Sequence, residues 1–446
     1  MIAERALIVG FGITGEAMAR ALTARGADVL VVDDHPSPER RRRAELAGVE
    51  LLEAPDREQW RTLVEGRSAV LPTPGLPEVH PVFAEAARAS VPVLSEFDLA
   101  AAWDDRPVLA ITGTNGKTTV TMMVTDMMNA SGRSAVAVGN TETPLVAAID
   151  DPTVDVFVVE ASSFRLAATQ RFVPTAATWL NFAADHLDVH ASLERYEHAK
   201  ARIWSDLDAD HGTAIANADD EVVMRHRNPQ ARTRTFGLGD RASVDYGVRG
   251  EQLLAPDDEP LVRTGELFRS LPHDISNALA ASATARAGGA TFDGVREVLR
   301  TFAGLPHRVE LVGERDGVRW YDDSKATAPH ATVAAVTGFA SVVLIAGGRN
   351  KGLDLSPLGE LAPHVRAVVA IGEAADDVVA AFAGRRPTVV ATTMADAVAR
   401  AAALAEPGDA VVLSPGCASF DWFTSYGHRG DVYTAEVRNL LGGAGS

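Results

Sequence analysis

The segment Gly113-Thr-Asn-Gly-Lys-Thr-Thr119 has the residue types and spacing of a phosphate-binding loop. It follows the apolar stretch 108–111 and precedes a helical pattern, so we expect it on a strand-loop-helix turn. The N–H groups of such a loop hold phosphates, Lys117 would reach the terminal phosphates, and the Thr118 hydroxyl could coordinate Mg²⁺. The loop reads Gly-x-x-Gly-Lys-Thr, shorter than the Walker A pattern, and it favours ATP over NAD.

A carboxylate and a histidine follow two further strand-like stretches. Glu160 ends the buried run 156–159, and Asp185 and His186 come after the run 177–180. Because ligands bind beyond the carboxyl ends of parallel strands, these side chains are expected at one sheet edge. Glu160 is a hard oxygen ligand that suits Mg²⁺. His186 is either a structural hydrogen-bonding residue or part of the same site.

Lysine is rare in this chain, which makes each lysine a candidate for chemistry. Only four of the 42 basic residues are lysines, namely Lys117, Lys200, Lys325 and Lys351. A guanidinium cannot replace a compact ammonium or a reactive primary amine. Lys200 lies in an expected helix over 193–207, where it is either a surface lysine with a buried stem or an amine carbamylated by CO₂. A carbamylated lysine would be an oxygen ligand for a second Mg²⁺.

Two other glycine-rich turns follow strand-like runs. Gly10-Phe-Gly-Ile-Thr-Gly15 has the spacing of a dinucleotide fingerprint, and Asp33 ends the next strand, where it could accept a ribose hydroxyl. This turn leaves a nicotinamide cofactor, another nucleotide and a purely structural turn all open. The second turn, 347–352, contains Lys351 and is either a binding turn or a tight left-handed turn.

Polar turns also end two strands of the last section. Asp322, Asp323 and Lys325 follow one strand, and the segment 414–421 follows another, so both turns are expected to face a cleft. Cys417 in the second turn is either a nucleophile or a small buried residue. The sequence favours the buried residue, because no base partner is assigned to this thiol.

Composition limits the possible classes of protein. The 446 residues are 46% hydrophobic and 23% charged, which excludes a disordered or fibrous chain. A net charge of −18 disfavours nucleic acids and acidic membranes as partners. The single cysteine indicates a reducing compartment, so a cytoplasmic location is expected. No apolar signal region or run of about 18 uncharged apolar residues is found, so neither export nor membrane insertion is expected.

Repeated strand-turn-helix patterns predict an α/β protein with parallel sheets. Breaks in the pattern at 101–107 and 302–307 divide it into three domains. We expect domains at 1–105, 106–304 and 305–446.

Seven separated motifs resemble those of the Mur ligase family, and the resemblance covers all three domains in order. The motifs are Gly113–Thr119, Glu160–Phe164, Asn181–Asp188, Lys200, Leu305–Arg308, Asp323–Thr327 and Ser414–Phe420. Within the family, the chain most resembles the members that add D-glutamate. The resemblance implies a Rossmann-like first domain, a central P-loop ATPase-like domain with a mostly parallel sheet, and a Rossmann-like third domain. The chain departs from the expected family pattern at Glu142, Asp274, Ala328 and Tyr426.

The resemblance also implies a set of site residues. Those expected to bind ATP are Gly113, Thr114, Asn115, Gly116, Lys117, Thr118, Thr119, Asn277, Arg308 and Asp323. Those expected to bind a UDP-linked substrate in place of NAD are Ile13, Thr14, Asp33, Thr73, Gly75, Asn140, Ser162 and His186. D-glutamate is expected on Thr327, Lys351, Ser419 and Tyr426. Two Mg²⁺ ions are expected on Thr118, Glu160, His186 and carbamylated Lys200, and the residues expected to act in catalysis are Lys117, Glu160, His186, Lys200, Asp323 and Lys325.

The implied reaction is the ATP-dependent addition of D-glutamate to UDP-N-acetylmuramoyl-L-alanine through an acyl phosphate, in cytoplasmic peptidoglycan synthesis. Closure of the third domain on substrate binding and a monomeric enzyme are expected. Three alternatives remain: a ligase of the same superfamily that adds L-alanine to the sugar or glutamate to a folate, an NAD-dependent dehydrogenase, and a protein that binds nucleotides without turnover.

Overall fold

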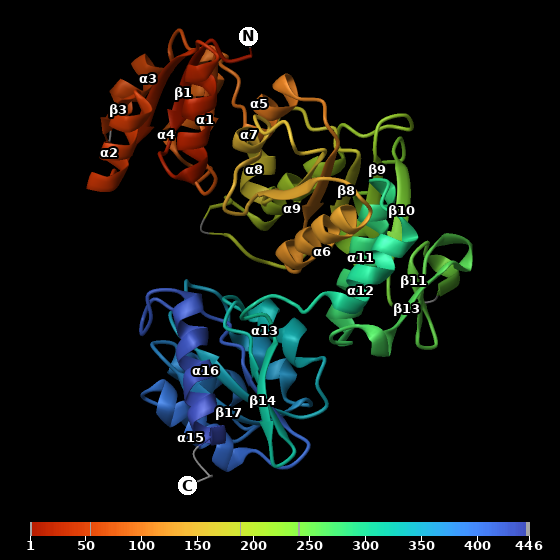
Figure 1. The fold of residues 1–446 in the computed structure, drawn as a ribbon. Coiled ribbons are helices and arrows are strands. Elements are labelled where there is room, and N and C mark those ends of the chain that lie inside the picture. Colours follow the sequence, from red (N-terminus) through yellow and green to blue (C-terminus); the bar gives the residue numbers. More distant parts are fainter. Residues whose placement is uncertain (1, 54, 188, 240, 443–446) are drawn as a thin grey trace. The chain divides into compact units, whose positions relative to one another are not determined.

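The computed structural model describes residues 2–53, 55–187, 189–239 and 241–442, and it contains mixed α/β architecture with parallel sheets. The chain forms two compact units, the first comprising residues 1–269 and 275–302 and the second comprising 270–274 and 303–446. Figure 1 shows helices lying against the strands in each unit. Among the described residues, no helix is both long enough and apolar enough to cross a membrane.

The first unit begins with a four-stranded parallel sheet in the order β3-β2-β1-β4. Its elements are β1 (Arg5–Val9), α1 (Ile13–Ala24), β2 (Asp28–Asp33), α2 (Pro38–Ala47), β3 (Glu50–Glu53), α3 (Arg57–Val64), β4 (Ala69–Pro72), α4 (Pro81–Ala89) and α5 (Glu96–Trp103). Side-chain caps define several helix starts. Ser95 and Asp98, for example, form a capping box at the start of α5.

A six-stranded sheet follows in the order β10-β9-β8-β5-β7-β6, and all of its pairs are parallel. Its strands are β5 (Val108–Thr112), β6 (Ala135–Gly139), β7 (Val156–Glu160), β8 (Ala176–Trp179), β9 (Thr213–Asn217) and β10 (Arg232–Phe236). A separate antiparallel sheet consists of β11 (Gly247–Arg249), β12 (Gln252–Leu254) and β13 (Pro260–Arg263). The apolar run in β7 is fully buried, as expected for a strand covered on both faces.

Helices cover this sheet, and one of them ends earlier than the sequence predicts. The helices are α6 (Lys117–Ala130), α7 (Leu145–Ala148), α8 (Ser163–Ala168), α9 (Leu193–Ala201), α10 (Glu221–Arg225), α11 (Pro272–Ala287) and α12 (Phe292–Thr301), with short 3₁₀ turns η1 (Arg202–Trp204), η2 (Arg241–Ser243), η3 (Pro256–Asp258) and η4 (Thr264–Glu266). A helix over 193–207 was expected. The α-helix ends at Ala201 because the chain tightens there and turns Trp204 into the core, where its indole N–H donates to Ala177 O over 2.8 Å.

The second unit contains a six-stranded sheet in the order β14-β15-β19-β16-β17-β18. Its elements are β14 (Glu310–Arg315), β15 (Val318–Asp322), α13 (Pro329–Val336), β16 (Val342–Gly347), the 3₁₀ helix η5 (Ser356–Leu361), β17 (Val365–Ile371), α14 (Ala375–Phe382), β18 (Thr388–Val390), α15 (Met394–Leu404), β19 (Ala410–Leu413) and α16 (Tyr426–Gly442). The edge strand β14 is antiparallel to β15, and its register shifts between Leu311 and Gly313.

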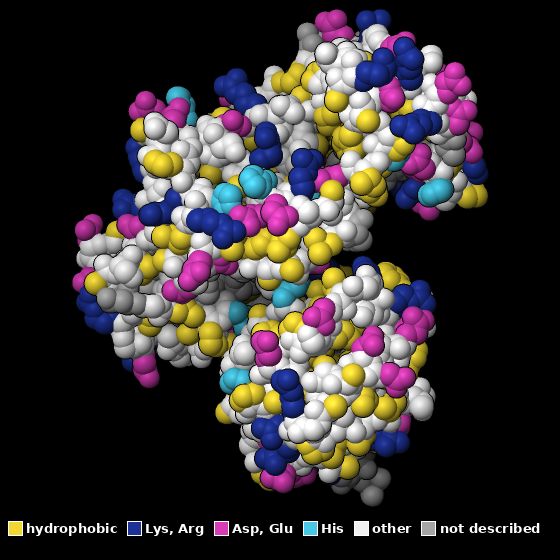
Figure 2. All heavy atoms as spheres, turned by 180° about the vertical axis from the view of Figure 1, so that it is seen from behind, with side chains coloured by type: hydrophobic (Ala, Val, Ile, Leu, Met, Phe, Trp, Pro, Cys, Tyr) yellow, Lys and Arg dark blue, Asp and Glu magenta, His cyan; other side chains and the backbone are white. Residues whose placement is uncertain are grey.

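The surface carries both signs of charge. Figure 2 shows basic and acidic side chains interspersed over the face in view. Many arginines are paired, as in the contacts of Arg41 with Glu53 and of Arg349 with Glu373. Positive charge on this face is therefore distributed among acidic groups.

Candidate active site

The phosphate-binding segment lies between β5 and α6, as a strand-loop-helix turn. Gly116 has φ +84°, and a Cβ at this position would lie 2.6 Å from Asn277 Oδ1, so the close approach requires glycine. Asn277 of α11 therefore lies beside this loop, and the family resemblance implies that both bind ATP. The first N–H groups of α6 make its N-terminus a favourable place for an anion.

Asn181 braces this loop from the end of β8. Its Oδ1 accepts hydrogen bonds from the N–H groups of Thr114 and Asn115, over 3.0 and 2.8 Å. The Thr114 hydroxyl also lies 3.2 Å from the hydroxyl of Tyr196 on α9. Sequence reasoning placed Asn181 in a motif without giving it a role, although its position directly after a parallel strand is a signal for a loop contact.

The Lys117 ammonium lies over the loop itself. Nζ donates to Gly113 O over 2.8 Å and to Thr114 O over 2.9 Å. The charge is thus held close to the N–H groups of the loop, and a phosphate bound there would compete with these carbonyls for it.

Lys200 of α9 is buried, which makes its interpretation as a surface lysine wrong. Its side chain is 1% exposed, its Nζ donates to Gly113 O over 2.7 Å, and the ammonium lies 4.6 Å from the centre of the Tyr196 ring. Burial, and next the positive charge of Lys117, hold the pKa of this amine well below its usual value, although Asp185 and Glu160 oppose that shift. A neutral amine is the form that reacts with CO₂, so the alternative interpretation remains available.

Glu160 ends β7 with an oxygen that fits a cation. Oε1 accepts a hydrogen bond from Asn140 Nδ2 over 2.9 Å, whereas Oε2 is buried and has no hydrogen-bond partner in the described part of the chain. Glu160 pairs in register with Ile111 of β5, two residues before the phosphate loop. Since buried polar atoms are normally paired, an orphaned carboxylate oxygen here fits Mg²⁺ and its preference for hard oxygen ligands. Thr118, in the first turn of α6, is the hydroxyl expected to share that ion.

His186 lies in an aromatic cluster beside Lys200. Its ring centre is 4.8 Å from that of Phe164 and 5.9 Å from that of Tyr196, the ring that contacts Lys200. His186 has φ +57°, a left-handed conformation that few non-glycine residues adopt. The motif also contains Asp188, which lies outside the described residues.

The glycine-rich turn after β1 is held by residues predicted for a UDP-linked substrate. Thr73 Oγ1 donates to Val9 O over 3.0 Å, and a Cβ on Gly10 would lie only 2.1 Å from that oxygen. Asp33 was expected to accept a ribose hydroxyl. Its carboxylate accepts from the N–H of Phe11 over 2.8 Å and from Arg40 over 3.1 Å, so it braces the turn, and the ribose contact stays a prediction.

Other residues of this group follow strands of two sheets, Ile13 and Gly75 in the four-stranded sheet and Ser162 in the six-stranded sheet. Ile13 is exposed in the first turn of α1, and Gly75 lies in the turn after β4 with φ +92°. Thr14 is buried and accepts a hydrogen bond from Arg165 over 3.1 Å, while Ser162 caps α8. The sequence did not single out Arg165, which contacts three of the predicted residues, Thr14, Asn140 and Ser162.

In the second unit, Arg429 of α16 links two polar turns that were predicted to face a cleft. This 1% exposed guanidinium donates to Ser324 O over 2.8 Å and to Cys417 O over 3.0 Å. The Ser414 hydroxyl donates to Asp323 Oδ2 over 2.7 Å, which joins the same two turns again. Burial lowers the pKa of Arg429 to about 10, so this side chain stays charged at neutral pH.

Residues predicted for D-glutamate lie near these turns. Lys325 Nζ lies 3.7 Å from the centre of the Tyr426 ring, and Ser419 Oγ is buried without a hydrogen-bond partner among the described residues. Thr327 is half-buried, and Lys351 is exposed in the loop after β16. Arg308 is half-buried ahead of β14.

Cys417 has the properties of a buried structural residue. It is 2% exposed, and burial raises the pKa of its thiol to about 12. Because the thiolate is the nucleophilic form, the structure favours the buried interpretation over a nucleophile.

Comparisons with known proteins agree with the motifs. Residues 111–285 match the Mur ligase middle domain, and residues 307–417 match the Mur ligase, glutamate ligase domain. The UDP-N-acetylmuramoylalanine--D-glutamate ligase of Frankia casuarinae is 43% identical, with 97% of this chain and 93% of that protein covered. The protein of the same name from Nitrosococcus oceani is 36% identical, with 99% and 98% covered.

Solved structures share the fold at lower identity. A pseudomurein peptide ligase type C from Methanothermus fervidus has a TM-score of 0.58 at 19% identity and covers 98% of this chain and all (100%) of its own. A UDP-N-acetylmuramate-alanine ligase from Thermotoga maritima has a TM-score of 0.55 at 18% identity, with 98% and 99% covered. The resemblance read from the motifs is confirmed by the domain matches and the relatives. The chain therefore belongs to the Mur ligase family, whose members are ATP-dependent ligases that form amide bonds.

Proposed function

We propose that this chain adds D-glutamate to UDP-N-acetylmuramoyl-L-alanine, with ATP converted to ADP and phosphate. One observation carries the reaction type: a buried, unpaired oxygen of Glu160 and the buried amine of Lys200 lie at the edge of the sheet that holds a phosphate loop. The names of the relatives that match nearly the whole chain support the choice of substrates.

Each predicted group of residues has a role in this proposal. The loop 113–119 binds the ATP phosphates through its N–H groups, with Asn277, Arg308 and Asp323 as further ATP contacts. The group for the UDP-linked substrate consists of Ile13, Thr14, Asp33, Thr73, Gly75, Asn140, Ser162 and His186. The D-glutamate group consists of Thr327, Lys351, Ser419 and Tyr426. Residues 1–105, 106–304 and 305–446 would form three domains for these ligands, the first and third Rossmann-like and the second P-loop ATPase-like.

The first chemical step activates a poor electrophile. An oxygen of the substrate carboxylate attacks the γ-phosphorus of ATP, the bond to the β-phosphate oxygen breaks, and ADP leaves an acyl phosphate. Lys117 offsets negative charge on the transferring group, provided that its ammonium turns from the loop carbonyls to the phosphate. The amine of D-glutamate then attacks the acyl carbon, phosphate leaves, and the amine loses a proton. Lys325 would hold a carboxylate of glutamate or the charge on the departing phosphate.

Mg²⁺ fits the unpaired Glu160 oxygen, and we propose two ions. Thr118 and Glu160 would hold one, while Glu160, His186 and carbamylated Lys200 would hold the other. When bound, Mg²⁺ supplies positive charge that screens the phosphates. Carbamylation would form a bond between the neutral Lys200 nitrogen and the carbon of CO₂, with loss of one proton.

The proposal includes a setting for the enzyme. A single cysteine and the use of ATP with a nucleotide-linked sugar support a cytoplasmic location. We expect a monomer, which sedimentation equilibrium would test.

Phosphate release is the decisive assay. The purified chain is supplied with ATP, Mg²⁺ and UDP-N-acetylmuramoyl-L-alanine, together with D-glutamate, L-glutamate or L-alanine. Of the three amino acids, only D-glutamate is expected to cause phosphate release. The product should be heavier than the UDP-linked substrate by one glutamyl residue. Activity with L-alanine on UDP-N-acetylmuramate would instead show a ligase that adds the first amino acid. Reduction of a nicotinamide without phosphate release would show a dehydrogenase.

A further inference from the structure

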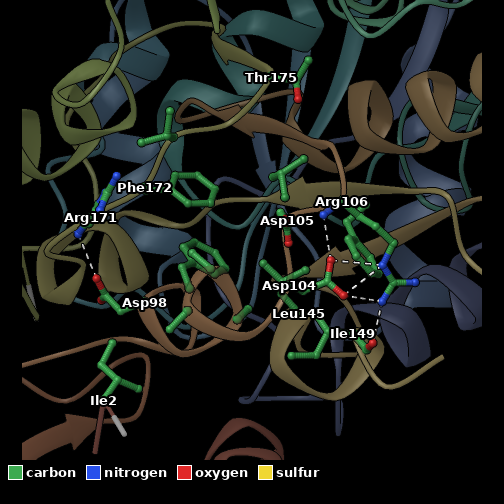
Figure 3. A pocket seen from close by; sticks show the side chains of 17 residues that line it. Ile2, Asp98, Asp104, Asp105, Arg106, Leu145, Ile149, Arg171, Phe172 and Thr175 are labelled. Carbon is green, nitrogen blue, oxygen red and sulfur yellow. Dashed lines mark hydrogen bonds and ion pairs between the residues drawn. The ribbon is translucent and has the colours of Figure 1, made fainter. Parts of the chain in front are cut away.

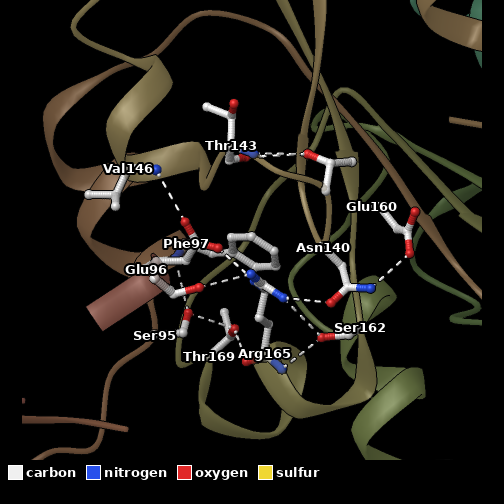
Figure 4. Close-up of polar contacts among 12 residues, drawn as sticks. Ser95, Glu96, Phe97, Asn140, Thr143, Val146, Glu160, Ser162, Arg165 and Thr169 are labelled. Atoms are coloured by element: carbon white, nitrogen blue, oxygen red, sulfur yellow. Dashed lines mark hydrogen bonds and ion pairs between the residues drawn. The ribbon is translucent and has the colours of Figure 1, made fainter. Parts of the chain in front are cut away.

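A buried ion pair in the first unit extends to two of the predicted ligand sites. Arg165 of α8 is 5% exposed, and its Nε donates to Glu96 Oε1 on α5 over 2.6 Å. The two other guanidinium nitrogens donate to Asn140 Oδ1 over 3.0 Å and to Thr14 Oγ1 over 3.1 Å. Figure 4 shows the guanidinium between Glu96 on one side and Asn140 and Ser162 on the other.

The contact with Asn140 determines how that amide faces Glu160. A guanidinium only donates hydrogen bonds and a carboxylate only accepts them, so Asn140 turns its oxygen to Arg165 and its NH₂ group to Glu160. Asn140 Nδ2 then donates to Glu160 Oε1 over 2.9 Å, and Oε2 remains unpaired (Figure 4). Since Asn140 itself is exposed, a partner is needed to hold this orientation. Arg165 therefore holds in place the amide that engages one oxygen of Glu160 and leaves the other for a cation.

The contact with Thr14 connects the same guanidinium to the N-terminal sheet. Thr14 lies in the first turn of α1, within the glycine-rich segment 10–15, and is 8% exposed. A substrate that contacts this turn and a cation that contacts Glu160 would therefore both act on one guanidinium, the substrate through Thr14 and the cation through Asn140.

Glu96 anchors the guanidinium. Its Oε2 accepts from the N–H of Val146 over 3.2 Å, so both oxygens are engaged. Burial raises the pKa of Glu96, an effect that Arg165 opposes. Separating the two side chains would leave each charge buried and unpaired, which is strongly destabilising. Glu96 therefore holds the guanidinium in its place.

We propose that Arg165 is a positioning residue that fixes Glu160 through Asn140 and couples cation binding at Glu160 to substrate binding at the Thr14 turn. The proposal rests on the proposed function, which assigns the cation to Glu160 and the UDP-linked substrate to Thr14. Coupling of this kind is reciprocal, because each ligand must change the affinity of the other by the same factor.

The test measures binding as well as turnover. Mn²⁺ serves as the cation probe, and its affinity for the full chain with ADP is measured by electron paramagnetic resonance, with and without saturating UDP-N-acetylmuramoyl-L-alanine. The variants are Arg165→Lys, Arg165→Gln and the double variant Glu96→Gln/Arg165→Gln, which removes both buried charges. Thermal unfolding verifies that each variant folds.

Arg106 provides a matched control. It also forms a close ion pair, with Asp104 over 2.6 Å, and donates to three backbone carbonyls. It lines a cavity of about 430 Å³ that none of the predicted ligand residues lines. Figure 3 shows Arg106 among the side chains around this cavity. Arg106→Gln should lower the melting temperature while leaving both affinities within about twofold of wild type.

In the wild-type chain, substrate should tighten Mn²⁺ binding by about fivefold or more. Arg165→Lys retains the charge beside Glu96 but cannot hold Asn140 and Thr14 together, so it should remove the coupling. Arg165→Gln and the double variant should also weaken Mn²⁺ binding by about 10- to 100-fold. If the glutamine variant does not fold, the lysine variant decides.

Two results would overturn the proposal. The first is that folded Arg165 variants bind Mn²⁺ with wild-type affinity and show wild-type coupling to the substrate. The second is that Arg106→Gln loses as much Mn²⁺ affinity and coupling as the Arg165 variants do. A wild-type chain that binds Mn²⁺ but not the UDP-linked sugar would refute the proposed function and the coupling together. The positioning of Glu160 would then be decided by the Mn²⁺ affinities of the Arg165 variants alone.

Discussion

The amine of Lys200 donates a hydrogen bond to Gly113 O over 2.7 Å, so one buried proton donor joins helix α9 to the phosphate loop. Lys117 donates to the same carbonyl over 2.8 Å. Two amines thus share one acceptor, and the positive charge of Lys117 is one reason why the pKa of Lys200 is lowered.

Replacing Lys200 should therefore test carbamylation. Lys200→Ala should lower turnover by about 100-fold or more, because a charged ligand near the phosphates is removed. Short carboxylic acids added to the variant should restore part of the phosphate release, since they supply the missing oxygens. Carbamylation would be contradicted if Lys200→Ala turned over as fast as wild type. It would also be contradicted if the added acids activated the variant and wild type equally.

The lowered pKa of Lys200 also predicts how stability varies with pH. Between that lowered value and 10.5, the unfolded chain binds a proton that the folded chain does not, so the free energy of unfolding rises with pH. Lys200→Met has no amine to titrate at this position in either the folded or the unfolded chain. Its stability relative to wild type should therefore fall as pH rises from 7 to 9.5, by at most about 1.4 kcal/mol per pH unit. Urea unfolding in CO₂-depleted buffer measures the difference. Parallel stability curves for the two proteins would contradict the prediction.

Arg429 should matter more for D-glutamate than for the UDP-linked substrate. Arg429→Lys cannot serve the carbonyls of both Ser324 and Cys417, and we expect a stability loss of about 2 kcal/mol, measured by urea unfolding. The KM for D-glutamate should rise by about tenfold, because the turns that carry its predicted ligands loosen. An equal rise in the KM of the UDP-linked substrate would indicate general damage instead.

Cys417 should behave as an inert thiol in the folded chain. Because its pKa is raised to about 12, it stays protonated at neutral pH, and iodoacetamide should label it only after unfolding in urea. Cys417→Ala should retain turnover within about twofold and lose about 1 kcal/mol of stability. Rapid labelling of the folded chain would contradict the buried assignment.

The sequence contains enough to predict the family and the parallel sheets, because apolar runs that end in glycine or polar turns specify buried strands and their ligand-facing ends. It also singles out Glu160 and Lys200 by type and position. It does not give the depth of Lys200, since a helical pattern indicates which face is apolar but not how deeply a neighbouring loop covers it.

Contacts between distant residues could not be predicted from the local pattern. The pair Glu96–Arg165 is separated by 69 positions, and each residue alone looks like an ordinary charged residue of a short helix. The brace from Asn181 to Asn115 spans 66 positions. Such partners are chosen by the packing of whole elements, which helix and strand periods do not encode. The end of α9 at Ala201 was missed for the same reason, because Trp204 packs against a strand earlier in the chain.

The antiparallel strand β14 has a consequence for association with other chains. An open sheet edge is a template to which a foreign strand can attach, and proteins protect such edges with irregularities and charge. Here the shifted register at Leu311 and Gly313 and the exposed acids Glu310 and Glu314 interrupt that template. The β14 edge of this sheet is therefore poorly suited to aggregation through strand addition, even when the chain is concentrated.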